Sequence, residues 1–371
     1  DKSYVVRVED TVLIWDGWRH PADVRARNIK IFSRDGKLLV SLPQVSIGLS
    51  MRALVQGRLA VASLGIRRLR ASVARFKDGS FTVGLQATEG AEQNIGGLLQ
   101  GVAHELSRPF GEAEGPLGYL KRVEVTESQL TFDDRQAGIV WHSPRADIVM
   151  SRESAGLKTD AAIVIEAQKR RSNLFAQLDY RRQSGKFLLR TRFENLNPSL
   201  LARSISGLDD LVNFSMPVTG EVALSVAKDG TLQKIGGGIV TPIGRVEGEF
   251  EFAGGGDDVV GLARFEALNV AEIAKRVPSL TKLSGLQVNF NGSIGGKGRR
   301  DGRITELEFN LASGAGAVDV PTLWHSPRQV KQIRFKGAIL NDFEEIELAE
   351  AILDFGGPKI EAEARVERIG G

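Results

Sequence analysis

The chain has 371 residues, of which 42% are hydrophobic and 42 are glycine, so it can bury a large core and is not disordered as a whole. It has no cysteine, which excludes disulfides, Cys-ligated zinc and thiol catalysis. The 49 basic and 46 acidic residues give a net charge of +3, which indicates a mixed surface rather than one that binds polyanions.

No uninterrupted apolar run reaches the roughly 18–20 residues that a membrane span needs. The chain begins at Asp1 with neither an initiator Met nor a signal sequence. We therefore expect a mature product or a piece of a longer protein.

Residues 1–90 form the first predicted segment, a series of short β-strands that begins a sheet. Alternating apolar residues flank two turns, at Asp35-Gly36 and at Asp78-Gly79. Asp-Gly between alternating runs is the strongest short-range hairpin signal, because a type I′ turn requires positive φ at its central residues. We therefore expect hairpins that close through type I′ turns.

Residues 91–196 form the second predicted segment, a helix and a loop followed by a β-meander. Apolar residues at helical spacing between Ile95 and Leu106 predict a short amphipathic helix. Residues 174–181 and 187–194 alternate between apolar and polar and predict two strands, each with one apolar face.

Residues 197–371 form the third predicted segment, which contains an internal repeat. Residues 197–248 align without a gap on residues 269–320, a shift of 72 positions (269 − 197). The two repeats therefore span residues 197–268 and 269–340, and closing strands follow them. A period of tens of residues indicates a repeat array rather than separate domains.

Each repeat is predicted to contain the same elements. Asn197 and Asn269 each suit the N-cap of a short helix, and a strand and an Asp-Gly hairpin follow. The hairpin motif of a basic residue, Asp, Gly, any residue and an apolar residue begins at Arg34, Lys77, Lys228 and Arg300. The five residues Trp-His-Ser-Pro-Arg also occur twice, at 141–145 and 324–328.

The stretch Arg245–Phe252 shows the strand pattern most clearly. Val246, Gly248, Phe250 and Phe252 share one face of a strand, and the residues between them are all charged. A helix would scatter the same residues around its axis. This strand therefore has one charged face, which suits solvent, and one apolar face.

Catalytic and metal-binding signatures are weak. His104-Glu105 is not followed by a second His, so the His-Glu-x-x-His zinc motif fails, and the repeated His142 and His325 suggest structural corners. Residues 292–298 lack the first glycine and the hydroxyl residue of a phosphate loop. The acidic pairs, which look like turn and surface residues, are Asp133-Asp134, Asp209-Asp210, Asp257-Asp258 and Glu344-Glu345. We predict no enzyme activity, no cofactor and no metal site.

Basic residues cluster at several places, and three interpretations are open. They are solvated faces or hairpin tips, phosphate contacts at a rim, or nucleic-acid contacts. The last is the weakest and we expect no nucleic-acid partner, because acids nearly balance the bases and stacking aromatics are scarce. The clusters are Arg67-Arg68-Arg70, Lys169-Arg170-Arg171, Arg181-Arg182 and Arg299-Arg300-Arg303.

The apolar side of the predicted strands must be covered, and three structures can do this: a second sheet, a sheet closed on itself, or a non-protein partner. A second sheet has the highest base rate, but a sandwich has no reason to repeat every 72 residues with a helix interposed. Repeats added end to end would lengthen one sheet, and strand twist would coil it. We expect a mainly β fold, an elongated, twisted antiparallel sheet coiled into an open groove, with a few short helices.

Several of these features together resemble a known family. They are the helix opening Asn-Pro or Asn-Val, the Gly-x-Val or Gly-x-Ile strand, the basic-Asp-Gly hairpin, and Trp15-Asp16-Gly17-Trp18 followed by Pro21. The chain is in these respects similar to the AsmA-like proteins, in particular the YhdP-type branch. The resemblance spans nearly the whole chain and consists of pattern and turn motifs rather than catalytic signatures.

The resemblance implies a periplasmic protein of the Gram-negative envelope that is anchored to the inner membrane and has a long β-groove. Members are thought to move phospholipid between the inner and outer membranes, as part of outer-membrane biogenesis. The implied partners are phospholipid acyl chains, the membranes at the two ends of the full-length protein, and other envelope proteins. The membrane helix of the family is missing here, so the chain resembles a fragment.

A lipid groove needs a continuous apolar lining, because each buried acyl CH₂ contributes about 0.8 kcal/mol while a headgroup contact contributes about 1–3 kcal/mol. The alternative is a structural or adhesive β-repeat protein that interacts with other envelope proteins. The predicted lining consists of Val222, Leu224, Val226, Val246, Phe250, Phe252, Val288, Phe290, Phe187, Leu189 and Phe193.

Overall fold

The chain is mainly β with a few short helices, as the sequence predicts. Its structure, a computed structural model, describes residues 5–14, 23–32, 38–86, 92–94, 106–109, 118–167, 170–203, 208–253, 255, 257–321 and 324–367. The turn at 35–36, the tryptophan stretch at 15–21 and all but the last residue of the helix predicted at 95–106 lie outside these residues.

The chain divides into two compact units, residues 1–191 and 192–371. This division falls five residues from the predicted boundary at 196. The first unit contains the predicted segment 1–90 and all but the last five residues of the predicted segment 91–196.

The first unit contains strands β1 to β12, the first part of β13, and the short helix α1 (Met51–Val55). The hydroxyl of Ser50 caps α1 by accepting a hydrogen bond from the Ala53 amide, 3.4 Å away. The strands are β1 (Val5–Arg7), β2 (Asp10–Ile14), β3 (Asp23–Phe32), β4 (Leu38–Leu49), β5 (Val61–Arg67), β6 (Arg70–Arg75), β7 (Phe81–Gln86), β8 (Glu92–Asn94), β9 (Arg122–Asp134), β10 (Ile139–Arg152), β11 (Gly156–Ala167), β12 (Arg170–Arg181) and β13 (Lys186–Leu196).

Strand β9 makes the pairings that depart from the expected antiparallel pattern. It pairs in parallel with β5 through Ser63–Arg67 and with β6 through Arg70–Arg75, and antiparallel with β10 on its other side. Residues 87–121 separate β7 from β9 and allow the chain to cross over, which a parallel pairing requires. The sheet of the first unit is therefore mixed, and the other strand pairings among its described residues are antiparallel.

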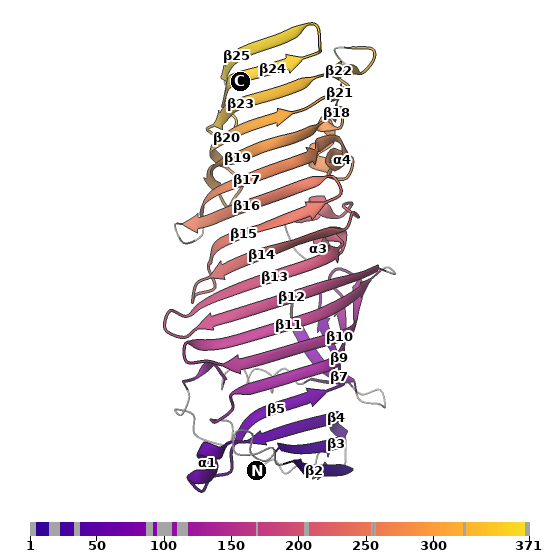
Figure 1. Ribbon diagram of the computed structural model, residues 1–371, viewed down its shortest axis with the longest axis vertical. Coiled ribbons are helices and arrows are strands. Elements are labelled where there is room, and N and C mark those ends of the chain that lie inside the picture. Colours follow the sequence, from indigo (N-terminus) through magenta and orange to yellow (C-terminus); the bar gives the residue numbers. More distant parts are fainter. Residues whose placement is uncertain are drawn as a thin grey trace. The chain divides into compact units, whose positions relative to one another are not determined.

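The second unit is built around nine antiparallel strands in the order β14-β15-β16-β17-β19-β20-β23-β24-β25 (Figure 1). These strands are β14 (Val218–Val226), β15 (Leu232–Thr241), β16 (Gly244–Ala253), β17 (Asp258–Asn269), β19 (Asn289–Arg299), β20 (Ile304–Ser313), β23 (Gln332–Leu340), β24 (Glu345–Asp354) and β25 (Lys359–Glu367). The order does not return to β14: β25 pairs with β24 and forms an edge among the described residues.

Smaller elements lie beside these nine strands. Helix α4 lies at the end of the strands where the small sheet of β18, β21 and β22 is found (Figure 1). These elements are α3 (Pro198–Ala202), the 3₁₀ helices η1 (Asp209–Leu211) and η3 (Pro278–Leu283), α4 (Val270–Ala274), β18 (Leu286–Gln287), β21 (Gly316–Val318) and β22 (Arg328–Val330).

The 72-residue repeat is present in the structure. The series β13, α3, η1, β14, β15 recurs as β17, α4, η3, β19, β20, and each strand and α-helix begins 72 residues after its counterpart, within one residue. Asn197 and Asn269 cap the two helices as predicted, accepting hydrogen bonds from the amides of Ser199 and Glu272, respectively. The match also extends upstream of residue 197, because the strand before each helix is part of the repeat.

Each repeat carries the same β-bulge. Asn195 and Ala267, 72 residues apart, have positive φ values of 55° and 51°. The amide of Asn195 donates to Thr219 Oγ1, and the amide of Ala267 donates to Asn291 Oδ1, again residues 72 apart. In each repeat the bulge takes one backbone amide out of the strand pairing, and a side-chain oxygen of a later strand accepts its hydrogen bond instead.

The three described basic-Asp-Gly hairpins are tight turns, but they are not of the predicted type I′. Gly79, Gly230 and Gly302 have positive φ values of 81°, 87° and 94°, while the aspartates before them do not have positive φ. A type I′ turn needs positive φ at both central residues, so that prediction is wrong. Each aspartate instead accepts a hydrogen bond from the amide two residues later, and the glycine forms a bulge that closes the hairpin.

Candidate functional site

One face of the nine-stranded sheet in the second unit is apolar throughout. Three rows of directly opposite residues cross all nine strands, and every member is apolar or glycine; we call these rows the apolar face. The first row is Gly220, Ile239, Val246, Phe265, Gly292, Leu311, Phe335, Ala351 and Ala362. The second is Val222, Gly237, Gly248, Ala263, Ile294, Phe309, Gly337, Leu348 and Ala364. The third is Leu224, Ile235, Phe250, Gly261, Gly296, Leu307, Ile339, Ile346 and Val366.

Six of the predicted lining residues lie on this side of the sheet. Val222, Leu224, Val246 and Phe250 belong to the three rows. The remaining two, Val226 and Phe252, follow two positions further along β14 and β16 and so point to the same side.

Over β14 to β17 the apolar face is more sheltered than the opposite face, as valines of these strands show, whereas Val366 of the apolar face, on β25, is 58% exposed. Val240 and Val260 point to the opposite face and are 48% and 49% exposed. Val222 and Val246, on the apolar face, are half-buried. Phe250 is the most accessible of the predicted lining residues in this unit, at 39% exposed. Most of the apolar face is therefore partly accessible rather than sealed as a core.

Glycines allow the aromatic rings of this face to lie flat on the sheet. Phe250 is directly opposite Gly261, and a Cβ at Gly261 would overlap the Phe250 ring. Phe309 is likewise opposite Gly337, where a Cβ would lie 2.9 Å from the ring atom Cζ. A ring that lies over a neighbouring glycine leaves a smooth apolar surface instead of a protruding side chain.

One end of the apolar face is closed by protein. Val288 and Phe290 are 2% and 5% exposed and pack with Val318, Val330 and Ile333. Trp324 and Phe355 pack against this cluster, with ring centroids 5.9 Å apart. The two predicted lining residues Val288 and Phe290 are thus parts of a protein core that covers the end of the face, not of its accessible portion.

The other three predicted lining residues lie on β13. Phe193 is buried, at the repeat position that corresponds to Phe265 of the apolar face. Phe187 and Leu189 belong to the first unit, where the exposed Phe187 ring contacts the Tyr180 ring with centroids 4.8 Å apart. The first unit has an apolar row of its own, made of Val125, Ile148, Ala161 and Ala176.

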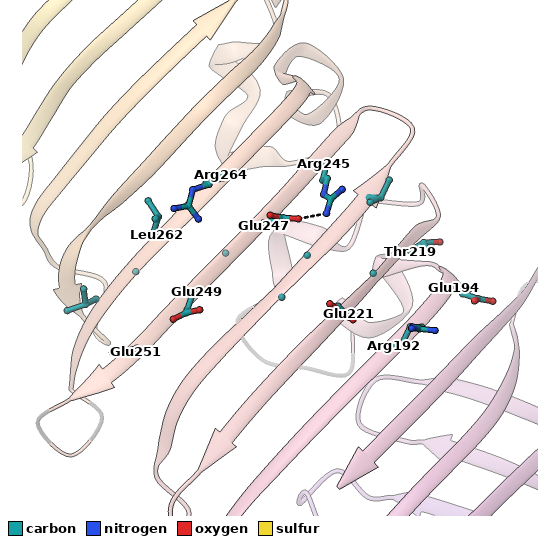
Figure 2. A pocket seen from close by; sticks show the side chains of 17 residues that line it. Arg192, Glu194, Thr219, Glu221, Arg245, Glu247, Glu249, Glu251, Leu262 and Arg264 are labelled. Carbon is teal, nitrogen blue, oxygen red and sulfur yellow. Dashed lines mark hydrogen bonds and ion pairs between the residues drawn. The ribbon is translucent and has the colours of Figure 1, made fainter. Parts of the chain in front are cut away.

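The opposite face of the second unit carries the charges. Side chains of β13, β14, β16 and β17 project beside one another on this face and line an open hollow (Figure 2). The hollow has a volume of about 1040 Å³. Its lining includes five glutamates and three arginines, so acids outnumber bases. Arg245 pairs with Glu247, and the carboxylates of Glu249 and Glu251 accept hydrogen bonds from Lys234 and raise the pKa of its ammonium group.

The described lining of the charged hollow contains no histidine. No group of three His, Asp or Glu side chains there or elsewhere among the described residues could hold a metal ion. His142 and His325 are both exposed, and His142 Nδ1 lies 3.2 Å from Thr131 Oγ1. His20 and His104 lie outside the described residues.

The two Trp-His-Ser-Pro-Arg copies do not form the same structure. The first lies within β10, where the Trp141 ring packs edge-on against Phe132 at 5.9 Å. The second leaves Trp324 outside any strand and begins β22 at Arg328. Identical residues therefore serve different local packing, and the repetition marks no shared site.

No protein-family model, curated protein or solved structure matches the chain. None of the helices in the described residues has the length and apolar composition of a membrane span. The geometry of the apolar face is thus the basis for assigning a function.

The sequence reasoning missed the glycines of the apolar face. The strand pattern places Gly248 on the apolar side of its strand but does not show that Gly237 lies opposite it in the second row. The available signal was register: once Asp-Gly turns fix the hairpins, each glycine can be paired with its cross-strand neighbour. The repeat also had a further signal, the shared Arg-Phe-Glu-x-Leu-Asn at 192–197 and 264–269, which brackets each bulge.

Proposed function

We propose that the apolar face binds the acyl chains of phospholipid and lets them pass along the sheet, without enzymatic chemistry. The observation that carries this proposal is the run of apolar residues and glycine across nine strands, partly accessible over most of its extent. A soluble protein rarely leaves a contiguous apolar area of this extent uncovered unless something binds there. Acyl chains fit because the face offers no repeated polar group that a peptide backbone would require.

The energetics agree with an acyl ligand. A 16-carbon chain moved fully out of water gains on the order of 10 kcal/mol, from about 0.8 kcal/mol per CH₂. A chain lying on a sheet is covered on one side only, so about half of that gain is available. Binding of this strength holds a lipid while still letting it move, because no single polar contact fixes its position.

The resemblance to AsmA-like proteins supports the same assignment and adds a location. We propose that the chain is part of a periplasmic protein anchored to the inner membrane, whose apolar face moves phospholipid toward the outer membrane. The rings that lie flat over Gly261 and Gly337 would help this movement, because they leave no protruding side chain that an acyl chain would have to pass. Partner envelope proteins would deliver and receive the lipid at the ends of the full-length protein.

Native mass spectrometry of protein purified without detergent tests this proposal first. We expect bound phospholipid, and we expect phospholipid with a diazirine in its acyl chain to crosslink to residues of the apolar face. Phe250→Asp should lower the crosslinking several-fold with unchanged β content by circular dichroism. Val260→Asp is the matched control, because Val260 is similarly exposed but lies on the opposite face.

Two results would contradict the proposal. One is a protein that carries no lipid and binds none when vesicles are added. The other is an equal loss of crosslinking in Phe250→Asp and Val260→Asp, which would show contact without preference for a face. If Phe250→Asp alone loses its β content, Phe250 belongs to a protein core instead.

A further inference from the structure

Residues 50–60 connect β4 to β5 and contain α1; we call them the α1 turn. They carry the two most exposed large hydrophobic side chains of the described residues, Val55 at 83% and Leu59 at 75%. The turn lies at the ends of these two strands (Figure 1). Strand β4 pairs with β3 and β5, and β5 pairs with β4 and β9. Because both strands already have two neighbours, further strands added to the sheet would not cover the turn.

Hydrogen bonds and buried alanines hold the backbone of the α1 turn in place. The Ser50 amide donates to the Ala60 carbonyl at 2.9 Å and joins the two ends of the turn. The Arg58 amide donates to the Ala53 carbonyl at 2.8 Å. Ala53 and Ala60 are 0% and 4% exposed, so the turn is anchored on its inner side. The exposure of the two aliphatic side chains is therefore a consequence of how the turn folds.

The charged residues of the α1 turn are both basic. Arg52 and Arg58 are exposed, and the sequence has no acidic residue from position 36 to position 77. Arg67 and Arg68, at the far end of β5, pair with Glu127, whereas Arg58 forms no ion pair with any described residue. The turn therefore carries positive charge that the described part of the chain does not neutralise.

The segment beside the α1 turn adds a tyrosine and a further basic residue. The Tyr119 hydroxyl donates to Gln56 Oε1 at 2.8 Å, and Lys121 is exposed. The Lys121 amide donates to the Ala62 carbonyl at 2.8 Å, just beyond the turn. Exposed aliphatic side chains with Tyr, Lys and Arg beside them are typical of surfaces that enter the boundary between water and lipid.

We propose that the α1 turn inserts into the surface of a bilayer that contains anionic phospholipid. Val55 and Leu59 enter the boundary between the headgroups and the acyl chains. Arg52 and Arg58 extend to the lipid phosphates, which attract basic side chains at an anionic surface. This contact adds to the acyl-chain binding proposed for the apolar face and does not depend on it.

The size of the exposed apolar surface favours a bilayer over a protein partner. A stable protein interface buries about 800 Å² on each partner, with a fully desolvated centre. The α1 turn offers two exposed aliphatic side chains, Val55 and Leu59, with charged residues beside them. A bilayer surrounds such side chains on all sides once they enter it, so two of them suffice for a reversible contact.

Single cysteines can report on this contact, because the chain has none of its own. Val55→Cys and Leu59→Cys in the whole chain are labelled with the dye NBD and mixed with vesicles of phosphatidylglycerol and phosphatidylcholine. We expect the emission to rise and shift to the blue, and a nitroxide on the lipid acyl chains to quench it. Val140→Cys is the control, since Val140 is 56% exposed on β10 and should give no change.

Substitutions separate the apolar part of the contact from the charged part. Val55→Gln should lower the partition constant for the mixed vesicles roughly tenfold, and Val140→Gln should leave it unchanged. Arg58→Gln should lower it about fivefold, as expected for one basic residue at an anionic surface. Arg264→Gln makes the same charge change at an exposed position of β17 and should have little effect.

Dye at residues 55 and 59 that does not respond to vesicles overturns the proposal, as does equal binding to anionic and to purely phosphatidylcholine vesicles. Equal losses in Val55→Gln and Val140→Gln overturn it too. A dye response that grows with protein concentration in the absence of vesicles would assign the turn to contact with a second copy instead.

Two further measurements separate this proposal from lipid binding by the apolar face. Phe250→Asp should still bind vesicles as the unchanged chain does. Val55→Gln should still crosslink to a short-chain diazirine phospholipid supplied as monomers, because that lipid reaches the apolar face without a bilayer. Loss of vesicle binding in Phe250→Asp would show that the apolar face, and not the α1 turn, makes the contact with the membrane.

Discussion

The ring of Phe250 lies directly over Gly261, its cross-strand neighbour, and occupies the space that a side chain at residue 261 would need. Gly261→Ala should therefore push the ring out of its place. We expect a loss of about 1–3 kcal/mol in the free energy of unfolding, as for other overpacked sites, measured by denaturant titration. Gly357→Ala, where no atom lies within 4 Å of the added methyl, should change it little.

The contact between Phe250 and residue 261 can be isolated in a double-mutant cycle. In a Phe250→Ala background the ring is gone, so Gly261→Ala should lose most of its effect. An equal loss in both backgrounds would mean that the cost comes from the backbone at residue 261 and not from the ring.

Two phenylalanines that the sequence places in one lining differ sharply in their surroundings. Phe290 is 5% exposed within the closed cluster, whereas Phe250 is 39% exposed. Phe290→Ala should lower the free energy of unfolding by about 3–5 kcal/mol, and Phe250→Ala by about 1–2 kcal/mol. Lipid crosslinking should show the reverse order, with the larger loss in Phe250→Ala. Similar stability losses at the two positions would argue that the face around Phe250 is a sealed core.

A bulge in the first unit resembles those of the repeats but is capped by a carboxylate. Glu127 has a φ of 52°, and its amide donates to Asp147 Oδ1 at 2.7 Å. This hydrogen bond holds the pKa of Asp147 below its ordinary value of 3.8. Because the folded pKa is the lower one, the stabilisation is complete above pH 3.8 and is lost as pH falls through the folded pKa.

Two substitutions at Asp147 distinguish the effect of the hydrogen bond to the bulge from the effect of the carboxylate charge. Asp147→Asn keeps an acceptor oxygen but does not titrate, so it should flatten part of the acid limb of the stability–pH curve. Asp147→Ala should speed hydrogen exchange at the Glu127 amide at all pH values. In the second unit, Asn291 caps the Ala267 bulge without a charge, and Asn291→Ala should show no such pH dependence.

The hairpin glycines offer a test of the revised turn type. Gly230 has a φ of 87°, a conformation that costs an alanine about 1–2 kcal/mol, so Gly230→Ala should destabilise by that amount in thermal or denaturant unfolding. Asp229→Gly should be tolerated worse here than in a type I′ turn, because Asp229 accepts the Thr231 amide at 3.0 Å. Gly314→Ala, at a site with open space and no positive φ, serves as the control.

The local pattern of this chain was predictable, because alternation reports directly on which side of a strand a residue lies. The strand at Arg245–Phe252, the N-caps at Asn197 and Asn269, and the 72-residue repeat all follow from neighbours in sequence. The three Asp-Gly turns within the described residues were placed correctly but given the wrong type, since Asp-Gly is compatible both with type I′ turns and with a glycine bulge.

What depends on distant contacts was not predictable from the same reasoning. Val288 and Phe290 alternate like the other lining residues, and only the return of β21, β22 and Trp324 shows that they are covered. The parallel pairings of β9 depend on a crossover of the chain, which alternation does not encode. The glycines under the aromatic rings required a register across strands, which one strand alone cannot supply.

The recurrence of the bulge at Asn195 and Ala267 has a consequence for how this architecture changes in size. Because each copy brings the backbone back to the same phase of the pleat, whole copies can be duplicated or deleted in frame with every side chain keeping its orientation. A single inserted residue has the opposite effect, because it moves every later side chain of its strand to the other face of the sheet. Evolution can therefore lengthen or shorten the sheet of such a protein by whole repeats.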